Sequence, residues 1–215
     1  MEENLFNFRK KYEKGALSKA SVDKNPMQQF RKWFFEAVES DTVAEANAMT
    51  LATLGTNGFP KGRVVLLKKY DEWGFYFYTN YNSDKGKAID QHPKVSLSFF
   101  WPALERQIII LGTASKTSEQ DSINYFNSRP KGSRIGAIVS QQSRVVNSRE
   151  ELEKKLLELE KKYENKEPQK PKNWGGYLVS PVSLEFWQGR PNRLHDRIRY
   201  TLQKDFNWKI ERLAP

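Results

Sequence analysis

Two arginines and a histidine alternate near the carboxyl end of the chain, at Arg193, His195 and Arg197. Side chains at every second position of a β-strand share a face, so a strand over 193–202 would project all three groups together. Two guanidinium groups beside an imidazole repel one another unless an anion neutralises them, and the planar fork of arginine suits phosphate or carboxylate. The spacing therefore indicates an anion site, although solvated arginines on a surface strand would show the same pattern.

Two further groups of residues could hold phosphate. Residues 125–133 end an expected helix and supply arginine, lysine, hydroxyl groups and a glycine that can turn backbone N–H groups inward. The strand that contains Arg63 and Lys68 combines with a helix start at 83–87, and helix N-termini bind phosphate through free N–H groups. Strand parity places Arg63 and Lys68 on opposite faces, so both reach one ligand only if the strand bends. Residues 125–133 alone do not single out a phosphate site, because any polar loop of this length contains similar residues.

Composition excludes several kinds of chemistry. The 215 residues carry a net charge of +10, which indicates anionic partners without choosing among nucleic acid, membranes and phosphorylated small molecules. Cysteine is absent and only two histidines occur, so disulfides, thiol catalysis and a histidine-rich metal centre are excluded. No dinucleotide, phosphate-loop or nucleophile-elbow motif occurs. The apolar runs are too short for a membrane span, and the first residues lack a signal-peptide layout. We therefore expect a cytoplasmic protein.

Short apolar runs between turns predict a β-rich α+β fold, an antiparallel barrel or sandwich. The strands are expected at 48–54, 61–69, 75–79, 94–101, 106–115, 174–180, 182–188, 193–202 and 207–212. Helices are expected after Asn25, Ser118 and Ser148, each of which can cap a helix N-terminus. We predict an N-terminal arm over 1–24 that is ordered only where something holds it, followed by a single domain over 25–215 with a linker at 164–173.

Lysine and glutamate alternate along the helix expected after Ser148. This charge run could bind nucleic acid, but pairs of opposite charge four residues apart are typical of a solvated helix face. The second interpretation is the ordinary one for such a sequence.

Short strings of residues that recur in one enzyme family run in order along nearly the whole chain. They are 63–68, 77–80, 104–107, 128–130, 135–137, 142–143, 174–176, 185–189, 192–197 and 211–215. The strings Arg-Leu-His-Asp-Arg and Glu-Arg-Leu-Ala-Pro are the most specific. Through these strings the chain resembles the pyridoxamine 5'-phosphate oxidase family.

The resemblance implies an FMN-binding split β-barrel with flanking helices, which works as a homodimer with flavin at the subunit interface. Such enzymes oxidise pyridoxamine 5'-phosphate and pyridoxine 5'-phosphate to pyridoxal 5'-phosphate, with oxygen as electron acceptor and hydrogen peroxide as product. The flavin performs the hydride transfer, so the protein needs no nucleophile and no metal. Two phosphorylated ligands also account for part of the positive charge without nucleic acid or membrane as partner.

The resemblance also implies roles for individual residues. The FMN site would comprise Arg63, Val64, Val65, Leu66, Leu67, Lys68, Tyr78, Thr79, Lys85, Gln107, Gln142, Ser143, Trp187 and Arg197, some of them from the partner subunit. The substrate site would comprise Lys68, Tyr125, Arg129, Ser133, Arg193, Leu194, His195, Arg9 and Tyr12, with Arg193 and His195 over the substrate ring as the catalytic residues. One position departs from the family pattern, because Asp84 stands where an arginine is usual and aspartate cannot donate to phosphate.

Two alternatives remain. The nearer one is another split-barrel protein, a flavin reductase or flavin-binding protein that acts on a different substrate. The more distant one is a non-catalytic barrel that binds RNA or DNA through its basic surface. The interleaving of lysine with glutamate speaks against the second, because nucleic-acid sites gather their cations into a stripe.

Overall fold

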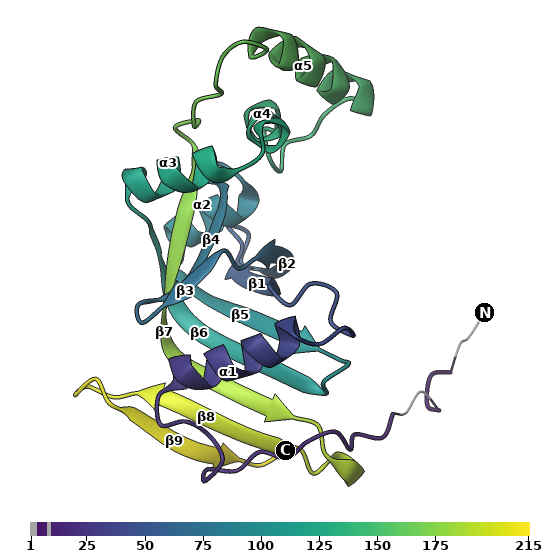
Figure 1. The fold of residues 1–215 in the computed structure, drawn as a ribbon, viewed down its shortest axis with the longest axis vertical. Coiled ribbons are helices and arrows are strands. Elements are labelled where there is room, and N and C mark those ends of the chain that lie inside the picture. The colour runs from purple at the N-terminus through teal and green to yellow at the C-terminus, as the bar shows by residue number, and fades with distance from the viewer. Residues whose placement is uncertain (1–3, 8–9) are drawn as a thin grey trace. The chain divides into compact units, whose positions relative to one another are not determined.

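A computed structural model describes residues 4–7 and 10–215 of the chain (Figure 1). Its strands pair into a nine-stranded sheet in which β2-β1-β5-β6-β7-β4-β3 are neighbours, and β8 pairs with β7 and β9. The strands are β1 (Ala48–Leu54), β2 (Pro60–Leu66), β3 (Lys69–Asp71), β4 (Gly74–Asn80), β5 (Lys94–Trp101), β6 (Arg106–Lys116), β7 (Trp174–Gln188), β8 (Asp196–Leu202) and β9 (Trp208–Leu213). The helices are α1 (Pro26–Val38), α2 (Asp84–Gln91), α3 (Glu119–Ser128), α4 (Lys131–Val139), α5 (Arg149–Lys162) and the short 3₁₀ helix η1 (Pro191–Arg193).

The chain divides into two compact units. Unit 1 contains Met1–Met49, Leu97–Leu111 and Pro181–Pro215, and unit 2 contains Thr50–Ser96 and Gly112–Ser180. Strands β1, β5, β6 and β7 contribute residues to both units. An arm over 1–24 and a single domain over 25–215 stay predictions.

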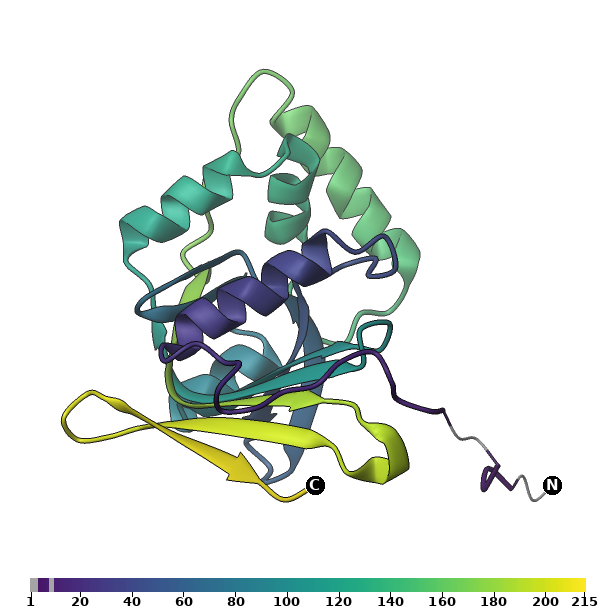
Figure 2. The ribbon, with the colours of Figure 1, turned by 60° about the horizontal axis from the view of Figure 1, so that its bottom comes forward.

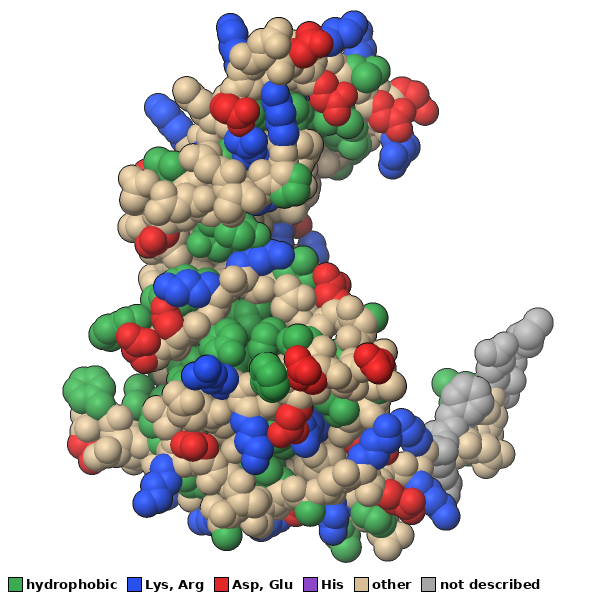
Figure 3. Space-filling view, in the orientation of Figure 1, with side chains coloured by type: hydrophobic (Ala, Val, Ile, Leu, Met, Phe, Trp, Pro, Cys, Tyr) green, Lys and Arg blue, Asp and Glu red, His purple; other side chains and the backbone are tan. Residues whose placement is uncertain are grey.

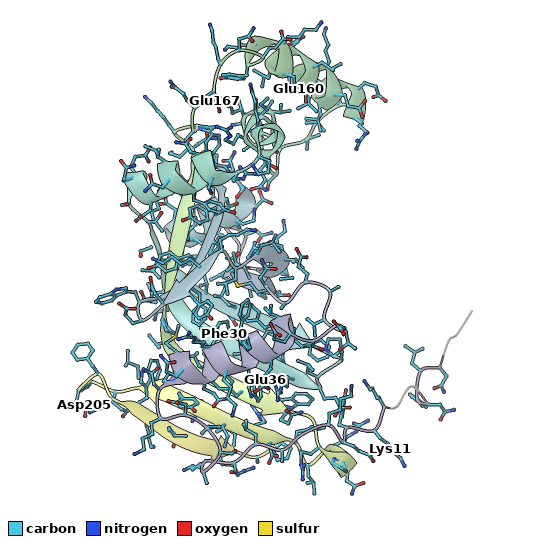
Figure 4. All side chains as sticks on the ribbon, in the orientation of Figure 1. Lys11, Phe30, Glu36, Glu160, Glu167 and Asp205 are labelled. Atoms are coloured by element: carbon cyan, nitrogen blue, oxygen red, sulfur yellow. The ribbon has the colours of Figure 1, made fainter. Side chains whose placement is uncertain are left out.

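Unit 1 is built around α1 and the β7–β8–β9 ribbon. Asn25 caps α1 by accepting the N–H of Met27, and Pro26 occupies the first turn, as the sequence predicts. Phe30 is fully buried and meets Phe99 edge-on at 5.4 Å between ring centroids (Figure 4). Strand β8 runs antiparallel to both β7 and β9. The apolar stripe of α1 therefore covers a sheet core, as its spacing indicates.

The N-terminal segment is fastened to unit 1 from residue 12 onward (Figure 2). The buried Glu105 side chain accepts the backbone N–H groups of Glu13 and Lys14 at 2.8 and 2.9 Å. Asp196 accepts the N–H of Leu17 at 2.9 Å, and Leu17 itself is buried. These contacts hold the second half of the predicted arm, because they satisfy its backbone donors inside the protein.

Unit 2 contains β2 to β4 and the helices α2 to α5. Strand β4 pairs antiparallel with the first half of β7, so that Tyr78 lies opposite Gly176. A side chain at Gly176 would collide with Thr117 and with the ring of Tyr78, and this close approach explains the second glycine of the Trp-Gly-Gly string. Ser118 and Ser148 cap α3 and α5, as the sequence predicts. Red and blue side chains intermingle on α5 (Figure 3), and Lys155 pairs with Glu151 one turn away.

Four elements differ from the sequence predictions. The strand predicted over 61–69 ends at Leu66, and the separate strand β3 begins at Lys69. Residues 174–188 form one continuous strand, because Pro181 is accommodated within it. The strand predicted over 193–202 begins only at Asp196. Asn192 and Arg193 have φ angles of 56° and 61°, in the left-handed region, which a β-strand does not contain. Helix α4 occupies residues for which no helix was expected, because Pro130 at its start replaces the usual side-chain cap.

We expect Glu105→Ala to free the start of the arm, because it leaves two backbone donors without their acceptor at a cost of roughly 1–3 kcal/mol each. The measurement is the rate of tryptic cleavage after Lys14, followed by mass spectrometry. Glu105→Gln keeps an acceptor oxygen and serves as the matched control with wild-type resistance. Equal cleavage rates in the alanine variant and the wild type would show that other contacts hold the segment.

Candidate functional site

A cavity of about 650 Å³ in unit 2 collects most of the residues that the resemblance assigns to the flavin and the substrate phosphate. This size suits a small-molecule ligand. Strand β2 and the residues after it, β4, α2, α3, α4 and the start of β7 supply its walls. The predicted residues that line it are Val64, Val65, Leu66, Lys68, Tyr78, Thr79, Lys85, Tyr125, Arg129, Ser133 and Gln142.

Lys85 is the buried cation of this cavity. Its Nζ donates to Oε1 of Gln142 at 2.9 Å and lies 3.3 Å from the hydroxyl groups of Thr79 and Ser83. Burial and, to a smaller extent, the nearby charge of Arg63 lower the pKa of Lys85 to about 8. Ser83 also caps α2 by accepting the N–H of Gly86, so a helix N-terminus lies beside the ammonium group. A bound anion would relieve the cost of burying this charge.

Aromatic rings surround the second cation, Arg129. The rings of Tyr78 and Tyr125 are stacked with centroids 3.8 Å apart, and Tyr125 and Trp174 are stacked at 6.1 Å. The guanidinium carbon of Arg129 lies 5.0 Å from the centre of the Trp174 ring. Burial lowers the pKa of Arg129, and its buried Nη1 has no hydrogen-bond partner among the described residues. An unpaired buried donor of this kind fits a phosphate ligand.

Arg63, Ser143 and Asp84 have partners other than a phosphate, and Leu67 belongs to the core. Arg63 donates to the carbonyl of Leu51 at 3.0 Å and to the hydroxyl of Thr53 at 2.8 Å. Leu67 is a buried core residue that does not line the cavity. The Ser143 hydroxyl accepts the backbone N–H of Asp84 at 3.2 Å. Lys61 lies 2.9 Å from the Asp84 carboxylate and lowers the pKa of that group.

A second cavity, of about 800 Å³, lies in unit 1 and contains the predicted catalytic residues. Trp187, Arg193, His195 and Tyr12 line it together. Tyr12 packs edge-on against Trp187 and His195, with ring centroids 5.7 and 5.5 Å away. His195 Nδ1 accepts the backbone N–H of Arg190 at 3.1 Å, so the neutral imidazole carries its proton on Nε2.

The prediction that Arg193, His195 and Arg197 share one strand face is wrong. Arg193 belongs to η1 and His195 lies in the turn that follows, so only Arg197 is on β8. Arg193 and His195 nevertheless line one cavity, although they do not share a strand. Arg197 instead pairs with Glu185 through two hydrogen bonds of 2.7 and 3.1 Å.

Two further predicted residues, Gln107 and Leu194, line neither cavity. Gln107 donates to the hydroxyl of Ser98 at 3.2 Å, within unit 1. Leu194 is 69% exposed and lines neither cavity. Arg9 lies outside the described residues.

Sequence reasoning gave no site role to several residues that line the cavities. In unit 2 these are Asn80, Pro130, Gly136, Ala137, Ser140 and Trp174, and in unit 1 they include Arg190. Trp174 belongs to the Trp-Gly-Gly string and Asn80 to the Tyr-Thr-Asn string, so the resemblance marked both. The burial that brings Trp174 against Arg129 has no local sequence signal.

Solved structures with the same fold define the class of protein. PhzG from Burkholderia lata, solved in complex with tetrahydrophenazine-1-carboxylic acid, matches 93% of this chain and 98% of its own with a TM-score of 0.86 and 26% identity. A pyridoxamine 5'-phosphate oxidase-related, FMN binding protein from Nostoc punctiforme covers 90% of this chain and 100% of its own with a TM-score of 0.69 and 18% identity. The fold is therefore the predicted FMN-binding split barrel.

Sequence comparisons identify the family. Residues 35–163 match the family model of pyridoxamine 5'-phosphate oxidase, and residues 174–215 match that of the pyridoxine 5'-phosphate oxidase C-terminal dimerisation region. Pyridoxine/pyridoxamine 5'-phosphate oxidases from Flavobacterium johnsoniae and Flavobacterium psychrophilum are 59% and 57% identical, over 98% and 99% of this chain and 99% of each relative. The chain belongs to the pyridoxamine 5'-phosphate oxidase family, whose cofactor is FMN. The predicted family, cofactor and homodimer are confirmed.

No helix among the described residues has the length and apolar character of a membrane-spanning segment.

The pKa of Lys85 predicts how flavin affinity depends on pH. Phosphate binds the charged ammonium, so above pH 8 the lysine must first take up a proton before it can pair. We expect the affinity of the flavin-free protein for FMN to fall about tenfold between pH 7 and pH 9. The measurement is a titration of FMN fluorescence quenching across this range.

Lys85→Met should weaken FMN binding at pH 7 and abolish most of this pH dependence. Lys87→Met is the matched control, because Lys87 is an exposed lysine on the same helix. A slope in the Lys85 variant as steep as in the wild type would assign the titration to another group.

Proposed function

We propose that this protein oxidises pyridoxamine 5'-phosphate and pyridoxine 5'-phosphate to pyridoxal 5'-phosphate, with FMN as cofactor and oxygen as electron acceptor. The observation that carries the proposal is the pairing, in one cavity, of two cations that lack a carboxylate partner among the described residues, Lys85 and Arg129. Two phosphate groups, one from the flavin and one from the substrate, require two such centres. The highly identical relatives carry the name of this activity.

Each ligand has its own set of groups in the unit 2 cavity. Lys85, Thr79 and Gln142 form one polar cluster, which we assign to the flavin phosphate at the start of α2. Arg129, Tyr125, Ser133 and Lys68 also line this cavity, and we assign them to the substrate phosphate. FMN, when bound, supplies the hydride acceptor, and the side chains supply position and charge.

The homodimer explains why the predicted residues fall into two groups. The resemblance assigns some flavin-site residues to the partner subunit, and in one chain Trp187, Arg193 and His195 line a different cavity from Lys85 and Arg129. We assign the two groups to different subunits of the same site. The match of residues 174–215 to a dimerisation region supports this division.

Arg193 and His195 are assigned to the substrate ring. Because Nδ1 of His195 accepts the backbone N–H of Arg190, the Nε2–H of the imidazole is available to donate to another group. Arg193 supplies a positive charge that holds electron-rich oxygen on the substrate. Together they orient the carbon that loses hydride and hold the proton at Nε2.

The proposal includes a cytoplasmic location. Phosphorylated small molecules do not cross a bilayer unaided, because charged groups are costly in hydrocarbon. An enzyme that acts on them therefore works in the compartment where they are made.

Anaerobic reduction of the flavin tests the function. The purified protein should be yellow, and pyridoxamine 5'-phosphate should bleach the FMN absorbance until oxygen is admitted. Reoxidation should release hydrogen peroxide with one pyridoxal 5'-phosphate formed per flavin reduced. A yellow protein that pyridoxamine 5'-phosphate fails to bleach would favour a split-barrel flavoprotein with another substrate, and a colourless protein that binds RNA would sink the proposal entirely.

Variants of Arg193 and His195 test the residue assignment. Arg193→Ala should weaken substrate binding by roughly 2–5 kcal/mol, the typical cost of truncating one member of a buried charged contact. His195→Asn should slow flavin reduction and leave FMN bound. Arg149→Ala, on the exposed face of α5, is the control with wild-type kinetics. Rapid-mixing reduction rates equal to wild type in both site variants would remove these residues from the site.

A further inference from the structure

Arg129 differs from the arginines of this protein that pair with an acid. Arg197 pairs with Glu185 and Arg134 pairs with Glu167, in each case at 2.7 Å. Arg129 has no such carboxylate among the described residues. Its guanidinium carbon instead lies 5.0 Å from the centre of the Trp174 ring and 6.0 Å from that of Phe126.

The difference matters for what the guanidinium can bind. A carboxylate partner occupies the in-plane N–H donors of arginine and cancels its charge. An aromatic ring attracts the cation through its face and leaves those donors free. The buried Nη1 of Arg129 has no hydrogen-bond partner among the described residues, so it can donate to a bound phosphate.

Trp174 is itself fixed from two sides. Its ring is parallel to that of Tyr125 within 6°, and it meets Phe126 at 71° with 5.2 Å between centroids. The side chain is 6% exposed, so its orientation is set by packing rather than by solvent. Tyr125 and Phe126 belong to α3, whose end carries Arg129, so the ring and the cation are positioned by the same helix.

We propose that Trp174 is a positioning residue that holds Arg129 for the phosphate group of the substrate, and thereby sets the preference for phosphorylated over unphosphorylated vitamers. This inference rests on the proposed function, because it takes the ligand of Arg129 to be the substrate phosphate. Trp174 acts through Arg129, so its loss is felt only by ligands that carry the phosphate.

The test compares Trp174→Leu with the wild-type holoenzyme. Leucine keeps an apolar side chain but provides no aromatic face, so the affinity for pyridoxal 5'-phosphate should fall roughly 2- to 30-fold, the range of one cation–π contact. The KM for pyridoxamine 5'-phosphate should rise in parallel. The affinity for pyridoxal, which lacks the phosphate, and the FMN content should stay at the wild-type level.

Trp33→Leu is the matched control. Trp33 is also buried, and Arg106 lies 4.5 Å from the centre of its ring, but it lines neither cavity. This variant also removes a buried indole from beneath an arginine, and it should leave the ratio of the two affinities unchanged.

A double-mutant cycle with Arg129→Ala decides whether Trp174 acts through the arginine. Independent effects add, whereas coupled ones do not. In the Arg129→Ala background, we expect Trp174→Leu to have no further effect on pyridoxal 5'-phosphate affinity. Should the leucine variant fail to fold, Trp174→Phe replaces it in the cycle, since it keeps a smaller ring and should give a smaller effect that also vanishes without Arg129.

Two results would overturn the inference. They are an unchanged affinity ratio in the Trp174 variant, with or without an equal loss of affinity for pyridoxal and its phosphate, and full additivity with Arg129→Ala. Failure of the proposed function looks different, because the wild-type protein itself would then bind pyridoxal 5'-phosphate no better than pyridoxal.

Discussion

The structure depends on the cost of holding positive charge away from water without an acid to neutralise it. Lys85 and Arg129 both line the unit 2 cavity, and burial lowers the pKa of each. Their partners are neutral oxygens in one case and aromatic faces in the other. Burying these cations without an acid costs free energy in the ligand-free protein. An anion that binds beside them offsets that cost, and the gain contributes to its binding free energy. The charges that line the cavity therefore favour anionic ligands.

The aspartate at position 84 shows how this balance is kept. Lys61 pairs with Asp84 on the exposed side of the α2 N-terminus, and the charge of Asp84 raises the pKa of the neighbouring Lys85. The helix cap is Ser83, so the carboxylate of Asp84 is free to interact with lysine. Where the family pattern has an arginine, this chain therefore has the ion pair of Asp84 with Lys61. Lys61 supplies a positive charge close to the start of α2.

Much of the fold could be predicted from the sequence, because local signals and tertiary packing agree there. The α1 cap at Asn25 and the strand β5 over 94–101 were predicted with their observed bounds. Helix α4 was missed, since its N-terminus carries Pro130 and no capping side chain. In the site, the family resemblance predicted many of the residues that line the unit 2 cavity, whereas the hydrogen bonds of Arg63 to Leu51 and Thr53 depend on a neighbouring strand. No periodicity reports such long-range partners.

The predicted strand over 193–202 is wrong, yet two of the residues that it grouped, Arg193 and His195, line the same cavity. Alternation would have placed Arg197 with Arg193 and His195, but the left-handed residues Asn192 and Arg193 end any regular spacing before β8 begins. Left-handed backbone angles cost free energy in residues other than glycine. A residue keeps such angles only where surrounding contacts enforce them. Here the Arg190 N–H bond to His195 and the packing of Tyr12 on the same imidazole provide those contacts. A straight strand places side chains by its fixed repeat, whereas these contacts fix a turn, so Arg193 and His195 line one cavity without sharing a strand face.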